Sequence, residues 1–307
     1  MTQGNLENIG HRGSAQATAH TAMTLCPKTV TVFLDASPSG KNRAAHAAAL
    51  AQRWGAHLIG VDVVFCGETM HPSHSFARGE KAVKGVFAEQ RRVDVDAEAA
   101  AAQLGEYFHA LCAGLDVAGE FRPVGRGQPA EEAIVNSLHS DLVVVGHPRP
   151  SGLPDDISQE RILFASGVPL LIVPNAWRGE TIGENVLIGW NASRQARRAV
   201  SDAMTLLVAA KTVTVLVIDP AARRRHGEEP GTDLALQLAR HGAHVTVEGV
   251  TSNGSPIAEV ILRYAAQCGS DLLVVGAYSH ARARELLLGG ATRTLLAQMP
   301  VPVLVSR

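Results

Sequence analysis

Short runs of apolar residues alternate along this chain with longer stretches in which apolar residues recur every three or four positions. The short runs are typical of strands buried on both faces, and the longer pattern is typical of amphipathic helices. Their alternation indicates βαβ units and a parallel sheet. The pattern predicts ten strands, at 30–34, 58–64, 120–124, 142–145, 170–173, 186–188, 213–218, 244–250, 272–275 and 303–305.

The chain uses one unit twice. The segment DLVVVG at 141–146 returns as DLLVVG at 271–276, and VPLLIV at 168–173 returns as VPVLVS at 301–306. Asp35-Ala-Ser37 returns in the same order as Asn191-Ala-Ser193. An internal repeat of this length indicates duplicated structural units.

The predicted fold is α/β, with two doubly wound, five-stranded parallel-sheet domains of Rossmann-like type in tandem. The repeat places the domains at 28–176 and 183–307. Residues 1–27 lack periodic apolar positions and are expected to be disordered.

Helix signals agree with these strands. Pro129 and Pro256 occupy equivalent positions that predict the first turn of a helix, and Ser193 is a good N-cap. Six apolar residues after Ser193 recur at helical spacing and predict one buried face: Ala196, Ala199, Val200, Ala203, Leu206 and Leu207. A long helix from about 79 to 115 has no counterpart in the second unit.

Composition narrows the class of protein. The formal net charge is −1 and the pI is near 6.9, which excludes a global field that would attract nucleic acid. No apolar stretch approaches the ~20 residues that cross a bilayer, and no signal peptide is apparent. Four cysteines without a CxxC pair favour a reducing compartment. We expect a cytoplasmic protein without a membrane or nucleic-acid partner.

The ligand crevice of a doubly wound sheet lies beyond the carboxyl ends of its strands, where strand order reverses. In the second unit, the segment after the fourth strand runs from Gly276 through Ser279 and His280 to Gly289-Gly290-Ala291-Thr292. Glycines let backbone N–H groups approach phosphate oxygens, and a helix beginning near Gly290 would direct its free N–H groups at the anion. Thr292 adds a hydroxyl donor.

At these residues the sequence resembles the universal stress protein family, whose nucleotide-binding members carry GxxG, nine residues, then Gly followed by Ser or Thr. Gly276 matches the first glycine and Gly289 the third, with nine residues between Ser279 and Gly289. Two positions depart from the pattern, because Ser279 replaces the second glycine and Gly290 replaces the hydroxyl residue. The resemblance covers both units, from about residue 28 onward.

The resemblance implies an adenine nucleotide, ATP or a relative with or without magnesium, in the second unit. It places Asn191 where an Asp usually meets the adenine, and Val217 where the second strand contacts the base. Asn191 is equally well explained as a turn residue that caps the next helix. His280 beside the phosphates would at most assist slow hydrolysis.

The first unit keeps Gly146 but has no glycine pair before its last helix. Alignment places either Asp156, or Gln159 and Glu160, opposite the second unit's Gly289 and Gly290. Either choice puts a carboxylate near the phosphates, so no nucleotide is expected there. Asp35 keeps the family's first-strand Asp, although a turn former is the simpler interpretation.

Cys66, Met70, His71 and His74 lie in an extra segment of the first unit. A soft-metal site would need a third spaced ligand, so we interpret this segment as a polar loop and expect no metal site.

Three functions remain in competition. The leading one is a stress-response regulator that binds adenine nucleotide in the second domain. The alternative is a nucleotide-free scaffold built as an internal pseudo-dimer. An enzyme is disfavoured, because the sequence has no GxSxG elbow, HExxH helix or paired-acid constellation, and we expect no catalytic residue.

Family members commonly pair through their last strands, so either a homodimer forms there or the two halves satisfy each other.

Overall fold

The computed structural model describes residues 26–63, 80–124, 129–154, 157–220, 231–277 and 290–307. The segment predicted to be disordered therefore lies almost wholly outside the described residues, as do Cys66, Met70, His71 and His74. Asp156 also falls outside them.

All ten predicted strands form. The first half has five strands and four helices among the described residues: β1 (Thr29–Leu34), α2 (Pro38–Trp54), β2 (His57–Val63), α3 (Glu80–Gly114), β3 (Gly119–Val124), α4 (Pro129–Leu138), β4 (Leu142–His147), α5 (Gln159–Ser166) and β5 (Leu170–Pro174). The second half has five strands and five helices there: β6 (Asn185–Trp190), α6 (Arg194–Asp202), α7 (Met204–Ala209), β7 (Thr212–Ile218), α8 (Thr232–Arg240), β8 (Val245–Val250), α9 (Ile257–Gln267), β9 (Leu272–Gly276), α10 (Gly290–Gln298) and β10 (Val303–Ser306).

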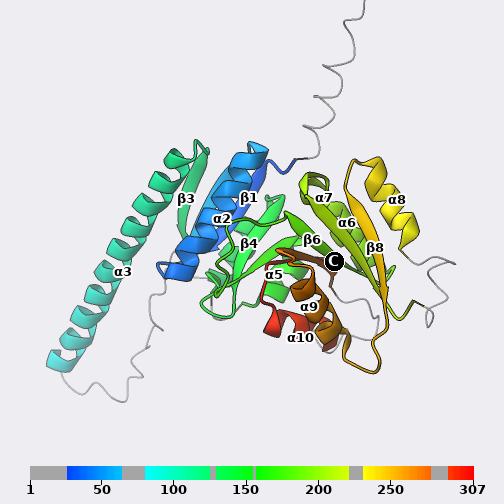
Figure 1. The fold of residues 1–307 in the computed structure, drawn as a ribbon. Coiled ribbons are helices and arrows are strands. Elements are labelled where there is room, and N and C mark those ends of the chain that lie inside the picture. Colours follow the sequence, from blue (N-terminus) through cyan, green and yellow to red (C-terminus); the bar gives the residue numbers. More distant parts are fainter. Residues whose placement is uncertain (1–25, 64–79, 125–128, 155–156, 221–230, 278–289) are drawn as a thin grey trace, which may run out of the picture.

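The strands form one ten-stranded sheet in the order β3-β2-β1-β4-β5-β10-β9-β6-β7-β8 (Figure 1). Pairing is parallel within each half and antiparallel between β5 and β10. Leu171 pairs with Leu304 at the centre of that junction. The expectation that the two halves satisfy each other's last strands is confirmed, because neither β5 nor β10 is left as an edge.

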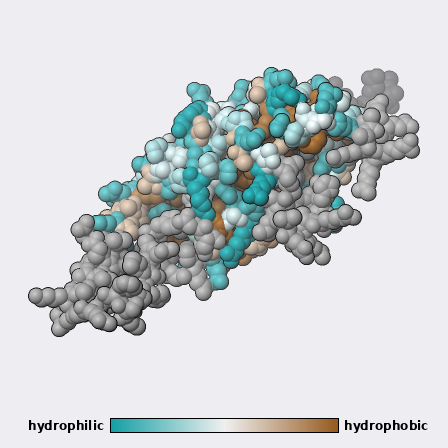
Figure 2. All heavy atoms as spheres, turned by 90° about the horizontal axis from the view of Figure 1, so that it is seen from below, coloured by the Kyte–Doolittle hydropathy of each residue, from teal (hydrophilic) through white to brown (hydrophobic). Residues whose placement is uncertain are grey.

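Helices cover both faces of this sheet. On one face, a buried apolar cluster joins the strands to α2, α3, α6, α7 and α8. On the other, a second cluster joins them to α4, α5, α9 and α10. Each cluster includes residues of both halves, so the core on each face of the sheet continues across the β5–β10 junction. In the view from below, hydrophilic residues cover much of the described surface and hydrophobic ones show between them (Figure 2).

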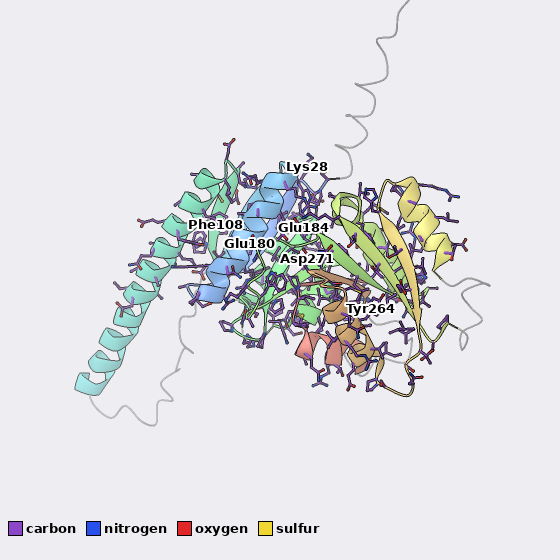
Figure 3. All side chains as sticks on the ribbon, in the orientation of Figure 1. Lys28, Phe108, Glu180, Glu184, Tyr264 and Asp271 are labelled. Atoms are coloured by element: carbon purple, nitrogen blue, oxygen red, sulfur yellow. The ribbon has the colours of Figure 1, made fainter. Side chains whose placement is uncertain are left out.

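The repeated Asp of the DLVVVG and DLLVVG segments has the same structural role in each half. The Asp141 carboxylate accepts hydrogen bonds from the N–H groups of Lys28 and Thr29, at 2.7 and 3.0 Å. The Asp271 carboxylate accepts from the N–H groups of Glu184 and Asn185, both at 2.9 Å (Figure 3). Each Asp therefore satisfies free donors at the start of its half's first strand.

Most helix signals are confirmed. Ser193 caps α6 by accepting from the Ala196 N–H at 3.1 Å, and Pro129 begins α4. Pro256 is the N-cap of α9 and not a residue of its first turn. The predicted stripe after Ser193 is buried, but the helix is interrupted at Ala203 and continues as α7.

Candidate functional site

The turn after β6 forms one wall of the predicted crevice. The Asn191 side-chain oxygen accepts a hydrogen bond from the Ser193 N–H at 3.1 Å, and Ser193 then caps α6. This is the turn-and-cap role that the sequence allowed for Asn191. This hydrogen bond fixes the Asn191 side chain through its oxygen, and the amide NH₂ is the group that could contact a ligand.

The end of β9 lies directly against this turn. A Cβ on Gly276 would collide with the Ala196 backbone N and with the Gln195 backbone carbon. Glycine is therefore required at this position so that the first turn of α6 can pack on β9. The structure brings together the Gly276 and Asn191 segments that the sequence assigned to one site, as expected for neighbouring parallel strands at a switch point.

Val217 lies beside Trp190 in the sheet, near the carboxyl end of β7. Its side chain is 2% exposed and belongs to the buried cluster on the α6 face. Gly231, with φ of +94°, precedes α8, and a Cβ there would lie 3.0 Å from Val217 Cγ2. Val217 thus supplies an apolar wall at the strand end, and its observed contacts are core packing. Trp190 also packs against this cluster, in accord with its expected packing role.

The phosphate segment is described only at its two ends. Ser279, His280 and Gly289 lie outside the described residues. Helix α10 begins at Gly290, as predicted, and Ala291 and Thr292 follow in its first turn. Thr292 is half-buried. A helix start at Gly290 presents free backbone N–H groups and the positive end of the helix dipole there.

The first half's crevice holds a buried arginine that the sequence reading did not single out. Arg43 of α2 is 1% exposed, and its Nε donates to the Phe33 carbonyl at 2.7 Å. One of its Nη atoms lies 2.8 Å from the Asp35 carboxylate. A Cβ on Gly146 would collide with the other Nη. The guanidinium therefore occupies the space between the ends of β1 and β4. Burial lowers the pKa of Arg43, and the Asp35 carboxylate opposes that change.

Asp35 also forms the turn that was its simpler interpretation. Its other carboxylate oxygen accepts from the Ser37 N–H at 3.0 Å, and the Ser37 hydroxyl accepts from the Gly40 N–H at 3.0 Å. The two halves thus build the same turn, with Asp35 and Ser37 matching Asn191 and Ser193. The carboxylate adds one bond that Asn191 does not make, the ion pair with Arg43.

A second buried carboxyl group lies at the end of β2. Asp62 pairs with Leu34 across the sheet and is 8% exposed. Burial, and to a smaller extent the nearby Asp35 carboxylate, together raise the pKa of Asp62 to about 6. The two carboxyl groups and the guanidinium make this crevice charged, and the Arg43 side chain occupies it.

The loop after β4 covers the same crevice at the ends of β1 and β4. The Gly146 N–H donates to the Ser151 carbonyl at 2.9 Å, and Gln159 Nε2 donates to the Gly146 carbonyl at 2.9 Å. Gly152, with φ of +76°, lies so close to β1 that a Cβ there would collide with the Phe33 carbonyl. Gln159 is the first residue of α5, as Gly290 is of α10, which favours the alignment of Gln159 with this region.

The second half carries neutral residues at the same three positions. The repeat matches Asp35 with Asn191, Asp62 with Val217 and Arg43 with Ala199. Ala199 is fully buried within α6 and has only a methyl group where Arg43 has its guanidinium. The sequence analysis missed two of these three pairs. An alignment of 35–62 with 191–217 shows the Arg43–Ala199 pair directly and needs a one-residue gap to show the Asp62–Val217 pair.

The described residues contain no group of three His, Cys, Asp or Glu side chains placed to hold a metal ion. Among the described helices, none is both long enough and apolar enough to span a membrane.

Comparison with known proteins gives one sequence match and several structural ones. Residues 184–307 match the model of the Universal stress protein family. No curated protein matches the chain. A universal stress protein from Archaeoglobus fulgidus DSM 4304 is structurally similar, with TM-score 0.63 and 15% identity, over 91% of this chain and 96% of that one. At this identity the likeness shows a shared fold, and it extends over both halves.

Two further structures are less similar. A putative universal stress protein from Pseudomonas aeruginosa UCBPP-PA14 has TM-score 0.49 and 16% identity, over 93% of this chain and 94% of that one. A universal stress protein in complex with cAMP has TM-score 0.30 and 18% identity, over 40% of this chain and 97% of that one. The α/β fold and the family match of its second half lead to one conclusion: residues 184–307 form a domain of the universal stress protein family.

Proposed function

We propose that this protein is a cytoplasmic regulator of the stress response that binds one adenine nucleotide, in the crevice of its second half. The first half is then a second universal stress protein domain that has lost this activity. The contrast at three matched positions carries the proposal: Asp35, Asp62 and Arg43 in one half, Asn191, Val217 and Ala199 in the other.

A nucleotide needs an apolar place for the base and N–H donors for the phosphates. The second half has Val217 at the end of β7, the Asn191 amide at the turn after β6, and a helix that begins at Gly290. These groups support the proposal of ATP, with or without magnesium, as the ligand. In the first half, Arg43 fills the corresponding space, and two carboxyl groups near it would repel phosphates.

The role proposed is binding and not catalysis, so nucleotide occupancy would act by shifting conformation or partner choice. The second candidate is a scaffold without nucleotide, favoured by the continuous β5–β10 pairing that already makes the chain an internal pseudo-dimer. Neither β5 nor β10 has a free edge for a homodimer, because each is paired on both sides within the chain.

The test is to denature freshly purified protein and identify released nucleotide by chromatography. Gly290→Asp is the decisive variant, because Asp in a first helical turn favours the helix while its charge repels phosphate. Gln159→Asp, at the first residue of α5, is the matched control. We expect adenine nucleotide from the wild type and from Gln159→Asp, and none from Gly290→Asp. If none of the three releases nucleotide and added ATP with magnesium gives no binding heat, the scaffold replaces this proposal.

A further inference from the structure

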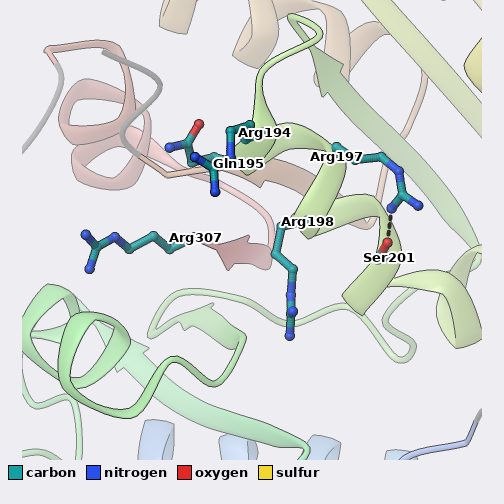
Figure 4. Close-up of a pocket in the computed structure, with 6 residues that line it drawn as sticks. All are labelled: Arg194, Gln195, Arg197, Arg198, Ser201 and Arg307. Carbon is teal, nitrogen blue, oxygen red and sulfur yellow. Dashed lines mark hydrogen bonds between the residues drawn. The ribbon is translucent and has the colours of Figure 1, made fainter. Parts of the chain in front are cut away.

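A hollow of about 620 Å³ on the second half is bordered mainly by arginines (Figure 4). Its volume is within the range of small-molecule sites, about 300–1,000 Å³. Six residues line it: Arg194, Gln195, Arg197, Arg198, Ser201 and Arg307. Four of these six have guanidinium groups and none has an acidic side chain, so the lining side chains are strongly positive in a chain whose net charge is −1.

The arginines come from two separate elements. Arg194, Arg197 and Arg198 lie at positions i, i+3 and i+4 of α6, which share one face of a helix. Arg307 directly follows β10, and α6 packs on that strand. The Arg307 guanidinium lies 4.2 Å from the ring centre of Phe164, a residue of α5. The hollow therefore lies where the second half adjoins a helix of the first.

Few carboxylates balance this charge. Arg198 Nε donates to the Asp202 carboxylate at 2.9 Å, and Arg197 donates to the Ser201 hydroxyl. Within the described ranges, no ion pair of Arg194 or Arg307 is found. The first turn of α6 contains no acidic residue, so its positive helix end adds to the same field. Like charges gathered in this way repel each other unless an anion lies between them.

The fold itself does not require these arginines, as the first half shows. The same positions of α2 are Pro38, Ser39, Lys41, Asn42 and Ala45, with a single cation. Lys41 lies over the Tyr107 ring, 5.0 Å from its centre. Asn42, which matches Arg198, donates to the Trp177 carbonyl at 3.0 Å, so the segment joining the halves covers this face of α2. That segment occurs once in the chain, and Arg194, Arg197 and Arg198 on the matching face of α6 are exposed among the residues that the structure describes.

We infer that this hollow binds a small anion carrying two or more phosphoryl groups. Guanidinium groups bind phosphoryl oxygens in paired, charge-assisted hydrogen bonds, and here they come from two elements of the structure. A single phosphate would leave most of the volume empty. The inference goes beyond the nucleotide proposed for the crevice, because the described lining residues lie on α6 and directly after β10. The hollow adjoins that crevice at Gln195, whose backbone lies against Gly276.

The experiment is titration calorimetry of the full chain with inorganic pyrophosphate. We expect Arg194→Gln combined with Arg307→Gln to weaken binding at least tenfold. Arg240→Gln, an exposed arginine at the end of α8, is the matched control and should leave the affinity unchanged. Thermal melts of each variant check that the fold is intact. Gly290→Asp should also leave pyrophosphate affinity unchanged, which separates this hollow from the crevice.

Four results would overturn the inference. These are absence of pyrophosphate binding to the wild type, equal losses in the double variant and in Arg240→Gln, loss in Gly290→Asp with none in the double variant, and equally tight binding of inorganic phosphate. The first three would remove the site, and the last would remove the requirement for two phosphoryl groups.

Discussion

The crevices of the two halves share a backbone plan and differ in charge. Both begin with an Asx turn and a serine cap after the first strand. In both, a glycine near the end of the fourth strand lies against the helix that follows the first strand. In the first, Arg43 bridges Asp35 and the Phe33 carbonyl, whereas Ala199 leaves that space in the second to the backbone of α6. The comparison teaches that a duplicated fold can keep its turn geometry while one copy fills the space beside that turn with its own side chain.

The largest expected effect comes from removing Arg43. Arg43→Ala would leave the Asp35 carboxylate and the Phe33 carbonyl without their partner in a buried site. We expect a loss of about 3 kcal/mol or more in the free energy of unfolding, as for other broken buried pairs. Urea unfolding measures it.

The control for Arg43 is Arg53→Ala, at an exposed position near the end of the same helix. Surface changes of this kind alter stability by less than about 0.5 kcal/mol. Equal effects of the two substitutions would show that the guanidinium does not hold the first crevice together.

The next largest effect is a pH dependence of stability caused by Asp62. Its pKa is raised from 3.8 to about 6 in the folded chain, so the unfolded state loses the proton first as pH rises. This group's contribution to stability therefore falls between about pH 4 and pH 6 and stays low above that range. The difference corresponds to about 3 kcal/mol at most. Asp62→Asn should stabilise the protein by up to that amount at pH 8 and have no effect at pH 4.

The converse substitution sharpens this comparison. Val217→Asp places a carboxyl group at the matching position of the second half, where it is again buried. It should destabilise that half more at pH 8 than at pH 4. Urea unfolding of both variants from pH 4 to pH 8 provides the measurement, and a pH-independent difference for Asp62→Asn would contradict the assignment.

The smallest expected effect tests the feature that the two halves share. Ser37 and Ser193 accept from backbone N–H groups at 3.0 and 3.1 Å. Replacement of either by Ala should cost about 1 kcal/mol, because each removes one N-cap hydrogen bond. Thermal melts of the two variants should agree closely. Unequal losses would mean that the caps are not equivalent.

The fold could be predicted from sequence because its signals are local. Buried parallel strands appear as apolar runs, and the repeat fixes their order, so all ten strands were located. The interruption at Ala203 could not be foreseen, since its flanking residues continue the helical pattern without a break. The β5–β10 register also depends on contact between segments far apart in the chain.

The site was predictable only in part, because only some of its features depend on nearby residues in the chain. The helix start at Gly290 and the cap at Ser193 follow from nearby residues and were anticipated. Arg43 looks like an ordinary polar position in a helix, and its burial is set by the geometry of β1 and β4 around it. The packing role of Gly276 against Ala196 likewise appears only when the strands are placed side by side.

We propose that only one of the two similar crevices binds nucleotide. Titration calorimetry of the wild type with ATP and magnesium, alongside Asp62→Asn and Gly290→Asp, tests it most directly, because one variant alters each crevice. We predict one ATP per chain for the wild type and for Asp62→Asn, with equal affinity, and no binding by Gly290→Asp. Two ATP per chain, or affinity that changes in Asp62→Asn and not in Gly290→Asp, would contradict the claim.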